Sequence, residues 1–90
     1  MRRVIIPKRF EKDVQLLKKR KFETDKLSAV LQTLADSGIL DQRYKDHPLR
    51  GDYVGCRECH IAPDWLLIYT ITDTELNLVR TGTHSDLFKK

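Results

Sequence analysis

The 90-residue sequence has no long hydrophobic run. Its longest nearly unbroken apolar stretch, from Trp65 to Ile71, is far shorter than the roughly 20 residues that a membrane-spanning helix needs. The apolar run near the start, from Val4 to Ile6, is also too short for the central region of a signal peptide. We therefore expect a cytoplasmic protein with no membrane partner.

Cysteine and methionine are scarce, with two and one copies respectively. The segment Cys56-Arg57-Glu58-Cys59-His60 matches the pattern for covalent haem attachment, and its first four residues match a thiol redox or zinc pattern. Residues three apart in a strand point to opposite faces at roughly 10 Å, too far to close a disulfide. Haem would need export and a second axial ligand, and zinc a second Cys-x-x-Cys. We expect two reduced thiols, no metal and no cofactor.

Internal repeats, linkers and low-complexity segments are also absent, and the length allows one small core but not two. We expect residues 1–90 to form a single domain. Charge is uneven: residues 1–26 hold ten Lys and Arg against four Asp and Glu, a net +6, whereas residues 27–90 hold seven against nine, a net −2. A basic N-terminal part suits a polyanion such as RNA, although a solvated lysine-rich helix explains the charge equally well.

Hydrophobic periodicity predicts an α+β fold in the order β-α-α-β-β-β, with one helical turn at residues 85–88 after the last strand. The two helices are expected to form a hairpin that covers one face of an antiparallel sheet. The elements before the final strands are a strand at 2–6, an amphipathic helix at 8–20, a second helix that Thr24 caps and Ser37-Gly38 ends, and a loop at 41–52.

Two turn-forming pairs, at residues 63–64 and 73–74, flank a segment rich in aromatic and β-branched residues. If both are two-residue hairpin loops, counting outward places His60, Leu67 and Arg80 in one row, with His84 on the same face. A one-residue slip in either turn would break this row.

The polar residues His47, His60, His84, Asp64 and Arg80 include the groups that metal-free phosphodiester cleavage requires. A base must take the proton from the ribose 2′-hydroxyl, an acid must protonate the leaving 5′-oxygen, and a cation must stabilise charge on the phosphate. Histidine titrates near neutrality and suits either proton role. Any one of the histidines alone is better explained by packing or simple exposure.

The aromatic residues Trp65, Tyr69 and Phe88 are candidates for stacking on unpaired bases. Core packing is the simpler explanation for Tyr69 and for Trp65. Phe88 lies two residues from the end of the sequence and four after a histidine, which makes a core position less convincing.

Three blocks of the sequence resemble the YafQ branch of the RelE/ParE toxin superfamily. They are Asp46-His47-Pro48-Leu49-Arg50-Gly51, the segment from His60 to Tyr69, and the segment from Arg80 to Phe88. The blocks occur in order, and the helical N-terminal part fits, so the resemblance covers nearly the whole chain. It implies a RelE-like fold and a bacterial type II toxin that cuts messenger RNA in the ribosomal A site. The cut needs no metal and leaves a 2′,3′-cyclic phosphate and a 5′-hydroxyl.

The resemblance also assigns residues to roles. His60 and Asp64 are candidates for proton abstraction and His84 for protonation of the leaving oxygen, although the sequence does not decide which histidine is base and which is acid. Arg80 would stabilise the phosphate, while His47 and Phe88 would position the RNA. The residues expected to bind RNA are Lys8, Arg9, Lys12, Lys18, Lys19, Arg50 and Trp65.

The partners implied by the resemblance are the 70S ribosome, messenger RNA and a ribbon-helix-helix antitoxin, in a toxin–antitoxin heterotetramer that meets operator DNA only through the antitoxin. Two other classes of function stay open. A ParE-like gyrase inhibitor would share the fold and would not need the three histidines. A non-catalytic nucleic-acid-binding module would need only the basic N-terminal part.

Overall fold

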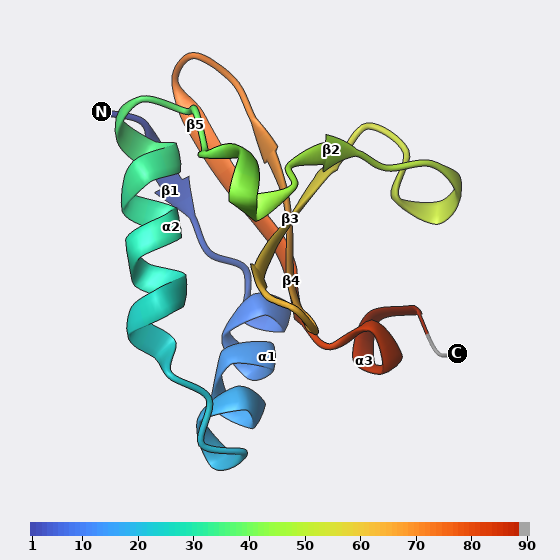
Figure 1. Cartoon of the computed structure of the whole chain (residues 1–90). Coiled ribbons are helices and arrows are strands. Elements are labelled where there is room, and N and C mark those ends of the chain that lie inside the picture. Colours follow the sequence, from blue (N-terminus) through green and yellow to red (C-terminus); the bar gives the residue numbers. More distant parts are fainter. Residues whose placement is uncertain (89–90) are drawn as a thin grey trace.

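The computed structural model describes residues 1–88, which form a five-stranded sheet with two long helices on one face and a short helix on the other (Figure 1). The α+β order expected from the sequence is confirmed. No helix among these residues is long and apolar enough to cross a membrane. The elements are β1 (Arg3–Ile5), α1 (Lys8–Lys19), α2 (Thr24–Asp36), β2 (His47–Pro48), β3 (Arg57–Ala62), β4 (Trp65–Ile71), β5 (Glu75–Gly82) and α3 (His84–Phe88), with 3₁₀ turns at Gln42–Tyr44 and Gly51–Tyr53.

The strand order across the sheet is β1-β5-β4-β3-β2. Neighbouring strands are antiparallel except β1, which pairs in parallel with β5, so the sheet is mixed and not purely antiparallel as expected. The segment predicted as a loop at 41–52 contains β2, whose two residues pair with Arg57 and Glu58. Pro48 has no N–H for a ladder, which suits this very short edge strand.

The helices bury the apolar positions that their sequence periodicity indicates. Phe10 and Leu17 of α1 are buried against the sheet, as are Leu27, Val30 and Leu34 of α2. A turn follows α1 in which Lys21 adopts the left-handed conformation, with φ of 68°. The N-cap of α2 is Glu23 and not Thr24, which is already helical, so the predicted cap is wrong by one residue.

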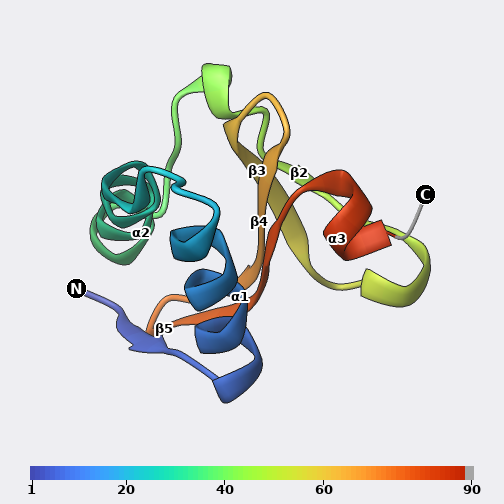
Figure 2. The ribbon, with the colours of Figure 1, turned by 90° about the horizontal axis from the view of Figure 1, so that it is seen from below.

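The sheet is covered on both faces because successive residues of β4 point in opposite directions. Leu67 and Tyr69 pack against α1 and α2, whereas Leu66 and Ile68 pack against Leu87 of α3. Figure 2 shows α2 and α3 on opposite sides of the central strands. The same alternation separates the two cysteines, since Cys59 lies in the helix-side cluster and Cys56 packs on the α3 side.

Two β-bulges change the register from the one expected. In the hairpin of β3 and β4, His60 pairs with Leu66 instead of Leu67. In the hairpin of β4 and β5, Arg80 pairs with Ile68 instead of Leu67. The expected row is therefore wrong, and Leu67 lies on the helix side. Leu66 and Ile68 are two residues apart on β4, so the two one-residue shifts cancel and His60 and Arg80 still share the face opposite α2.

Candidate active site

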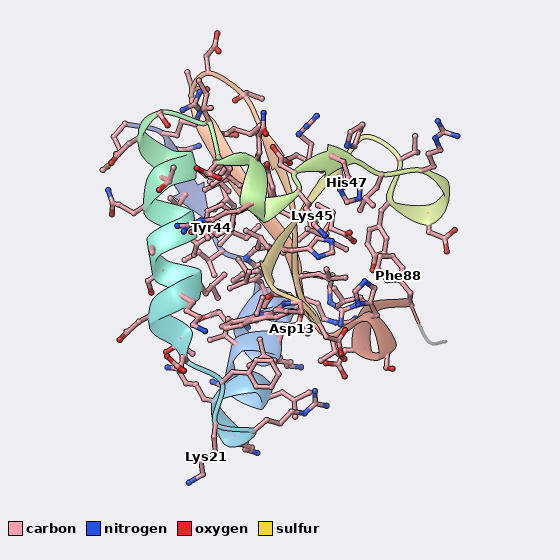
Figure 3. The ribbon with its side chains drawn as sticks, viewed as in Figure 1. Asp13, Lys21, Tyr44, Lys45, His47 and Phe88 are labelled. Carbon is pink, nitrogen blue, oxygen red and sulfur yellow. The ribbon has the colours of Figure 1, made fainter. Side chains whose placement is uncertain are left out.

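The three histidines lie side by side on the face of the sheet opposite α2. The ring centroids of His47 and His60 are 6.3 Å apart, and those of His60 and His84 are 6.0 Å apart. Phe88 continues the row, 6.5 Å from His84, and its ring packs edge-on against Tyr53. Figure 3 shows His47 and Phe88 on this side of the molecule. This row contains four of the six predicted catalytic side chains, from β2, β3 and α3.

Asp64 holds His84 in place from the turn between β3 and β4. Its Oδ1 accepts the backbone N–H of His84 at 3.0 Å and approaches the ring Nδ1 at 2.6 Å. These hydrogen bonds lower the pKa of Asp64, so the carboxyl group is ionised and accepts the Nδ1 proton. The Nε2 atom of His84 is consequently the nitrogen left for chemistry.

Glu58 is a candidate site residue that the sequence reasoning missed. Its Oε1 lies 3.3 Å from Nε2 of His47 and 3.7 Å from Nε2 of His60, and its side chain is only 7% exposed. The other oxygen, Oε2, is buried with no hydrogen-bond partner among residues 1–88. One signal was present, because Glu58 precedes His60 by two residues on the same strand and so faces the same way.

The surroundings of His60 favour its neutral form. Burial makes the largest contribution to lowering its pKa below the ordinary value, and the neighbouring charges of His84, Lys45 and His47 act in the same direction. The carboxylate of Glu58 opposes them. An imidazole that is neutral near pH 7 can accept a proton.

His47 is oriented by the backbone of a strained residue. Its Nδ1 donates to the carbonyl oxygen of Lys45 at 2.7 Å, which turns Nε2 toward Glu58. Lys45 has φ of 52°, a left-handed conformation that lysine adopts infrequently. Backbone strain of this kind tends to persist where function requires it.

Arg80 is fixed by a second residue that the sequence did not reveal. The carboxylate of Asp13 on α1 accepts from Arg80 Nε at 2.7 Å and Nη2 at 3.1 Å, and it also accepts the backbone N–H of Thr81 at 3.1 Å. This pairing raises the pKa of Arg80. The guanidinium group is therefore held in one orientation at the edge of the histidine face.

A cavity of about 420 Å³ links Arg80 to two predicted RNA-binding residues, Arg9 and Arg50. Phe88 and Tyr53 also line it. The cavity thus lies at the Phe88 end of the histidine row. The other cations predicted to bind RNA, Lys8, Lys12, Lys18 and Lys19, are exposed on α1 and lie outside this cavity.

Trp65 lies in the core, where the sequence also allowed it to be. Its ring is 2% exposed and packs edge-on against Phe22 at 5.1 Å. The indole Nε1 donates to Thr81 Oγ1 at 2.9 Å, so its polar atom is satisfied internally. The prediction that Trp65 stacks on RNA is corrected accordingly, because the ring offers no free face.

The short helix that carries His84 and Phe88 is anchored to α1. Asp86 pairs with Arg20 through two hydrogen bonds, at 2.8 and 3.1 Å, and accepts the backbone N–H of Thr83 at 3.0 Å. The pair lowers the pKa of Asp86 to about 2. Gly82 leaves room for this packing, since a Cβ there would meet Asp86 at 3.0 Å.

Residues 1–88 contain no group of three or more histidine, cysteine, aspartate or glutamate side chains arranged to hold a metal ion. The Cys59 thiol is fully buried, and burial raises its pKa to about 12. The face presents imidazole, carboxylate and guanidinium groups, which can transfer protons, orient one another and stabilise negative charge.

Comparison with known proteins places this site in a family. Residues 2–89 match the family described as "Bacterial toxin of type II toxin-antitoxin system, YafQ". The chain is 45% identical over 80 residues to the mRNA interferase toxin YafQ of Escherichia coli K12, covering 88% of this chain and 87% of that protein. A putative toxin YafQ of Haemophilus influenzae is 34% identical over 90 residues, covering 92% and 88% of the two chains.

Solved structures agree with this match. The E. coli DinJ–YafQ complex contains a chain that is 42% identical, with a TM-score of 0.89 and coverage of 98% of this chain and 99% of that one. A metal-bound toxin from Helicobacter pylori is 43% identical, with a TM-score of 0.88 and coverage of 98% and 100%. The chain therefore belongs to the YafQ family of bacterial toxins of type II toxin–antitoxin systems, and it is a homologue of an mRNA interferase.

Proposed function

We propose that this toxin is a ribosome-dependent, metal-independent endoribonuclease that cuts messenger RNA in the ribosomal A site. The observation that carries the proposal is the row of His47, His60 and His84, with adjacent rings about 6 Å apart on one face. Asp64 and Arg80, each already oriented by its own hydrogen bonds, flank this row. Such a set supplies proton transfer and charge stabilisation for phosphodiester cleavage.

His60 is suited to the role of general base. Its lowered pKa keeps the imidazole neutral near pH 7, ready to accept the proton of the ribose 2′-hydroxyl. The 2′-oxygen then bonds to phosphorus, the bond from phosphorus to the 5′-oxygen breaks, and a 2′,3′-cyclic phosphate forms. In this scheme Glu58 positions His47 and His60, which both lie against its Oε1.

His84 is suited to the role of general acid. Protonated at both nitrogens, it would donate from Nε2 to the leaving 5′-oxygen, which becomes the 5′-hydroxyl, while Asp64 holds Nδ1. Asp64 was also a candidate base, but its Oδ1 already accepts two hydrogen bonds from His84. We therefore assign Asp64 to the orientation of His84.

Arg80 would stabilise the charge that develops on the phosphate. Asp13 engages Nε and Nη2, and a guanidinium group carries five N–H donors, so others remain for a phosphate oxygen. Phe88, which lines the same cavity as Arg80, would contact an unpaired base.

The remaining parts of the proposal concern partners. The basic α1 surface would bind ribosomal RNA phosphates without reading sequence. A ribbon-helix-helix antitoxin would pair with the toxin in a heterotetramer and carry the contact with operator DNA; the complex of the E. coli homologue with DinJ supports such a partner. A gyrase inhibitor or a simple nucleic-acid-binding module would leave the histidine row without a purpose.

The test is cleavage of a defined messenger RNA on programmed 70S ribosomes, mapped by primer extension. Discrete cuts should appear with wild-type toxin and ribosomes, and fall by roughly 10²- to 10⁴-fold in His60→Ala and His84→Ala. Lys21→Ala, at the far tip of the helical hairpin, is the control (Figure 3). Thermal unfolding of each variant checks the fold. Undiminished single-turnover cleavage in both histidine variants would reject the mechanism.

Metal independence needs its own experiment, because a related toxin is described as metal-bound and ribosomes themselves require magnesium. The toxin alone is treated with chelator, desalted and then added to ribosomes in fixed magnesium. Activity should be unchanged, and added zinc, manganese or nickel should not raise it. Restoration of lost activity by one particular ion would overturn the proposal.

A further inference from the structure

A second cavity lies on the other side of His60, along the outer edge of β3. It has a volume of about 640 Å³ and is lined by His60, by Lys26 of α2 and by Arg43, Tyr44 and Lys45 near the first 3₁₀ turn. β2 pairs with β3 only at residues 57 and 58, so no strand covers the edge beyond them. We call this space the Lys45 pocket.

The charges of the Lys45 pocket are unbalanced. Lys26, Arg43 and Lys45 form no ion pair with any carboxylate in the described part of the chain, whereas Arg20, Arg57 and Arg80 all do. Arg43 instead donates to Tyr44 Oη at 2.9 Å, with its guanidinium carbon 4.9 Å from the centre of that ring. Three uncompensated cations around one cavity attract a polyanion.

Lys45 connects the pocket to the histidine row. Its carbonyl oxygen accepts His47 Nδ1 at 2.7 Å, its side chain lines the pocket beside His60, and its charge helps to lower the pKa of His60. Its left-handed backbone is held by the 3₁₀ turn, through a hydrogen bond from its N–H to the Gln42 carbonyl at 3.0 Å. Lys45, in its left-handed conformation, therefore contacts His47 through its carbonyl oxygen and places its side chain beside His60.

Two cavities thus flank the histidines, and cations line both, although Asp52 and Asp86 also line the one at Arg80. The Lys45 pocket opens beside His60, and the Arg80 cavity opens beside Phe88. Both volumes fall in the range of sites that hold small ligands, roughly 300 to 1,000 Å³. An extended RNA strand with its scissile phosphate at the histidines would occupy both cavities with its flanking nucleotides.

We propose that the Lys45 pocket binds the RNA nucleotide adjacent to the cleaved bond, with the Lys45 ammonium group on the neighbouring phosphate and Lys26 and Arg43 on the backbone beyond it. The proposal rests on the ribonuclease function proposed above and adds a substrate subsite to it. The planar Arg43 guanidinium group, already stacked over Tyr44, suits contact with an unpaired base.

The test compares two lysines with the same backbone conformation. Lys21 and Lys45 both have positive φ and both are exposed, but Lys21 lies at the far end of the molecule from His47 (Figure 3). Lys45→Gly and Lys21→Gly each remove an ammonium group and keep a backbone that glycine adopts readily. Lys45→Gly also keeps the carbonyl group that orients His47.

Single-turnover cleavage on ribosomes is measured as a function of toxin concentration and of salt. Lys45→Gly should raise the half-saturating toxin concentration roughly 5- to 50-fold. The slope of log affinity against log salt concentration should also become shallower, by the amount expected for the loss of about one phosphate contact. Lys21→Gly should stay within about twofold of wild type. Equal values for the two variants would overturn the proposal.

Messenger RNAs with a single neutral methylphosphonate on either side of the cleaved bond identify the contact. At one of these positions the neutral group should weaken the binding of wild-type toxin about tenfold. The same RNA should not weaken the binding of Lys45→Gly any further, because both changes remove the same interaction. If the effect of Lys45→Gly and the effect of the methylphosphonate multiply at both positions, the proposed contact between Lys45 and the phosphate is rejected. If wild-type toxin does not cut ribosome-bound RNA at all, the proposed function fails instead, so the two failures are distinguishable.

Discussion

His84 and Asp64 form a two-point contact in which a single carboxylate oxygen accepts both the backbone N–H and the ring Nδ1–H of the histidine, at 3.0 and 2.6 Å. The two hydrogen bonds fix the position of the residue and the tautomer of its ring. The Asp64 side chain is 66% exposed. Its contribution is thus the orientation of His84 and not the burial of a charge.

Changing Asp64 to alanine should slow single-turnover cleavage by roughly tenfold to 100-fold, less than loss of a general acid itself. Asp64→Asn should be milder, since an amide oxygen can accept the same two hydrogen bonds. Asp73→Ala, in the exposed turn of the next hairpin, is the matched control and should have no effect. Identical rates for Asp64→Ala and Asp73→Ala would remove Asp64 from the site.

The pH dependence of cleavage should reveal the effect of the Glu58 carboxylate on the pKa of His60. Burial lowers the pKa of His60, and the Glu58 carboxylate works against this by favouring the imidazolium form. Removing that negative charge in Glu58→Gln should lower the pKa of His60 further. The acidic limb of the pH–rate profile should therefore move to lower pH, measured between about pH 5 and pH 8.

A fall in rate with an unmoved acidic limb would mean that Glu58 acts only on structure. Lys45→Gly should shift the acidic limb in the opposite direction. Loss of a neighbouring positive charge should raise the pKa of His60 and move the limb to higher pH. Opposite shifts from the two variants are difficult to obtain from unfolding.

The sequence predicted the parts of this site that depend on local pattern. Helical spacing in residues 8–20 indicated that Phe10 and Leu17 face the core, and they are buried. Turn residues at 63–64 located the hairpin that carries Asp64. Strand alternation would also have found Glu58, had the position two residues before His60 been considered.

Other parts depend on packing between elements far apart in the chain. Two bulges set the partners of His60 and Arg80, one in the pairing of β3 with β4 and one in the pairing of β4 with β5, and no residue type in those strands indicates them. Asp13 reaches Arg80 across 67 positions of sequence, from a helix face that reads only as polar. Only the tertiary structure brings these residues together.

Any substitution of Arg80 that removes the planar guanidinium group should reduce cleavage. Arg80→Lys keeps the charge but cannot pair with both oxygens of Asp13 while also reaching a phosphate. We expect cleavage to fall roughly 10- to 100-fold, comparable to loss of an oriented charge-stabilising group. Asp13→Asn should give a smaller loss in the same assay. Wild-type rates in Arg80→Lys would show that only the charge matters.

Asp86 should stabilise the toxin in a pH-dependent way. Its pKa of about 2 lies below the ordinary value of 3.8, so its stabilising effect is present above about pH 4 and is lost as the pH falls toward 2. Because the Arg20 side chain is 40% exposed, solvent screening limits the effect to about 1 kcal/mol. Urea unfolding should show Asp86→Asn less stable by this amount at pH 7.

The difference between Asp86→Asn and wild type should shrink toward zero between pH 4 and pH 2. Asp73→Asn serves as the control, since Asp73 makes no ion pair among residues 1–88. A difference that stays constant down to pH 2 would place the effect in packing of α3 and not in the ion pair.

Electrostatic attraction should speed the initial encounter between the toxin and its antitoxin. Residues 1–26 carry a net +6, and the lysines at positions 8, 12, 18 and 19 are exposed on α1. If an acidic antitoxin segment covers this surface, its association rate should fall about tenfold between 50 and 150 mM salt, because exposed charges act mainly on encounter. Stopped-flow measurements of wild-type toxin and of a variant with all four lysines changed to glutamine give the comparison, and the variant should lose most of the salt dependence. An association rate that barely changes with salt would point instead to apolar contacts, for which Leu16, 44% exposed on the same helix, is the residue to change first.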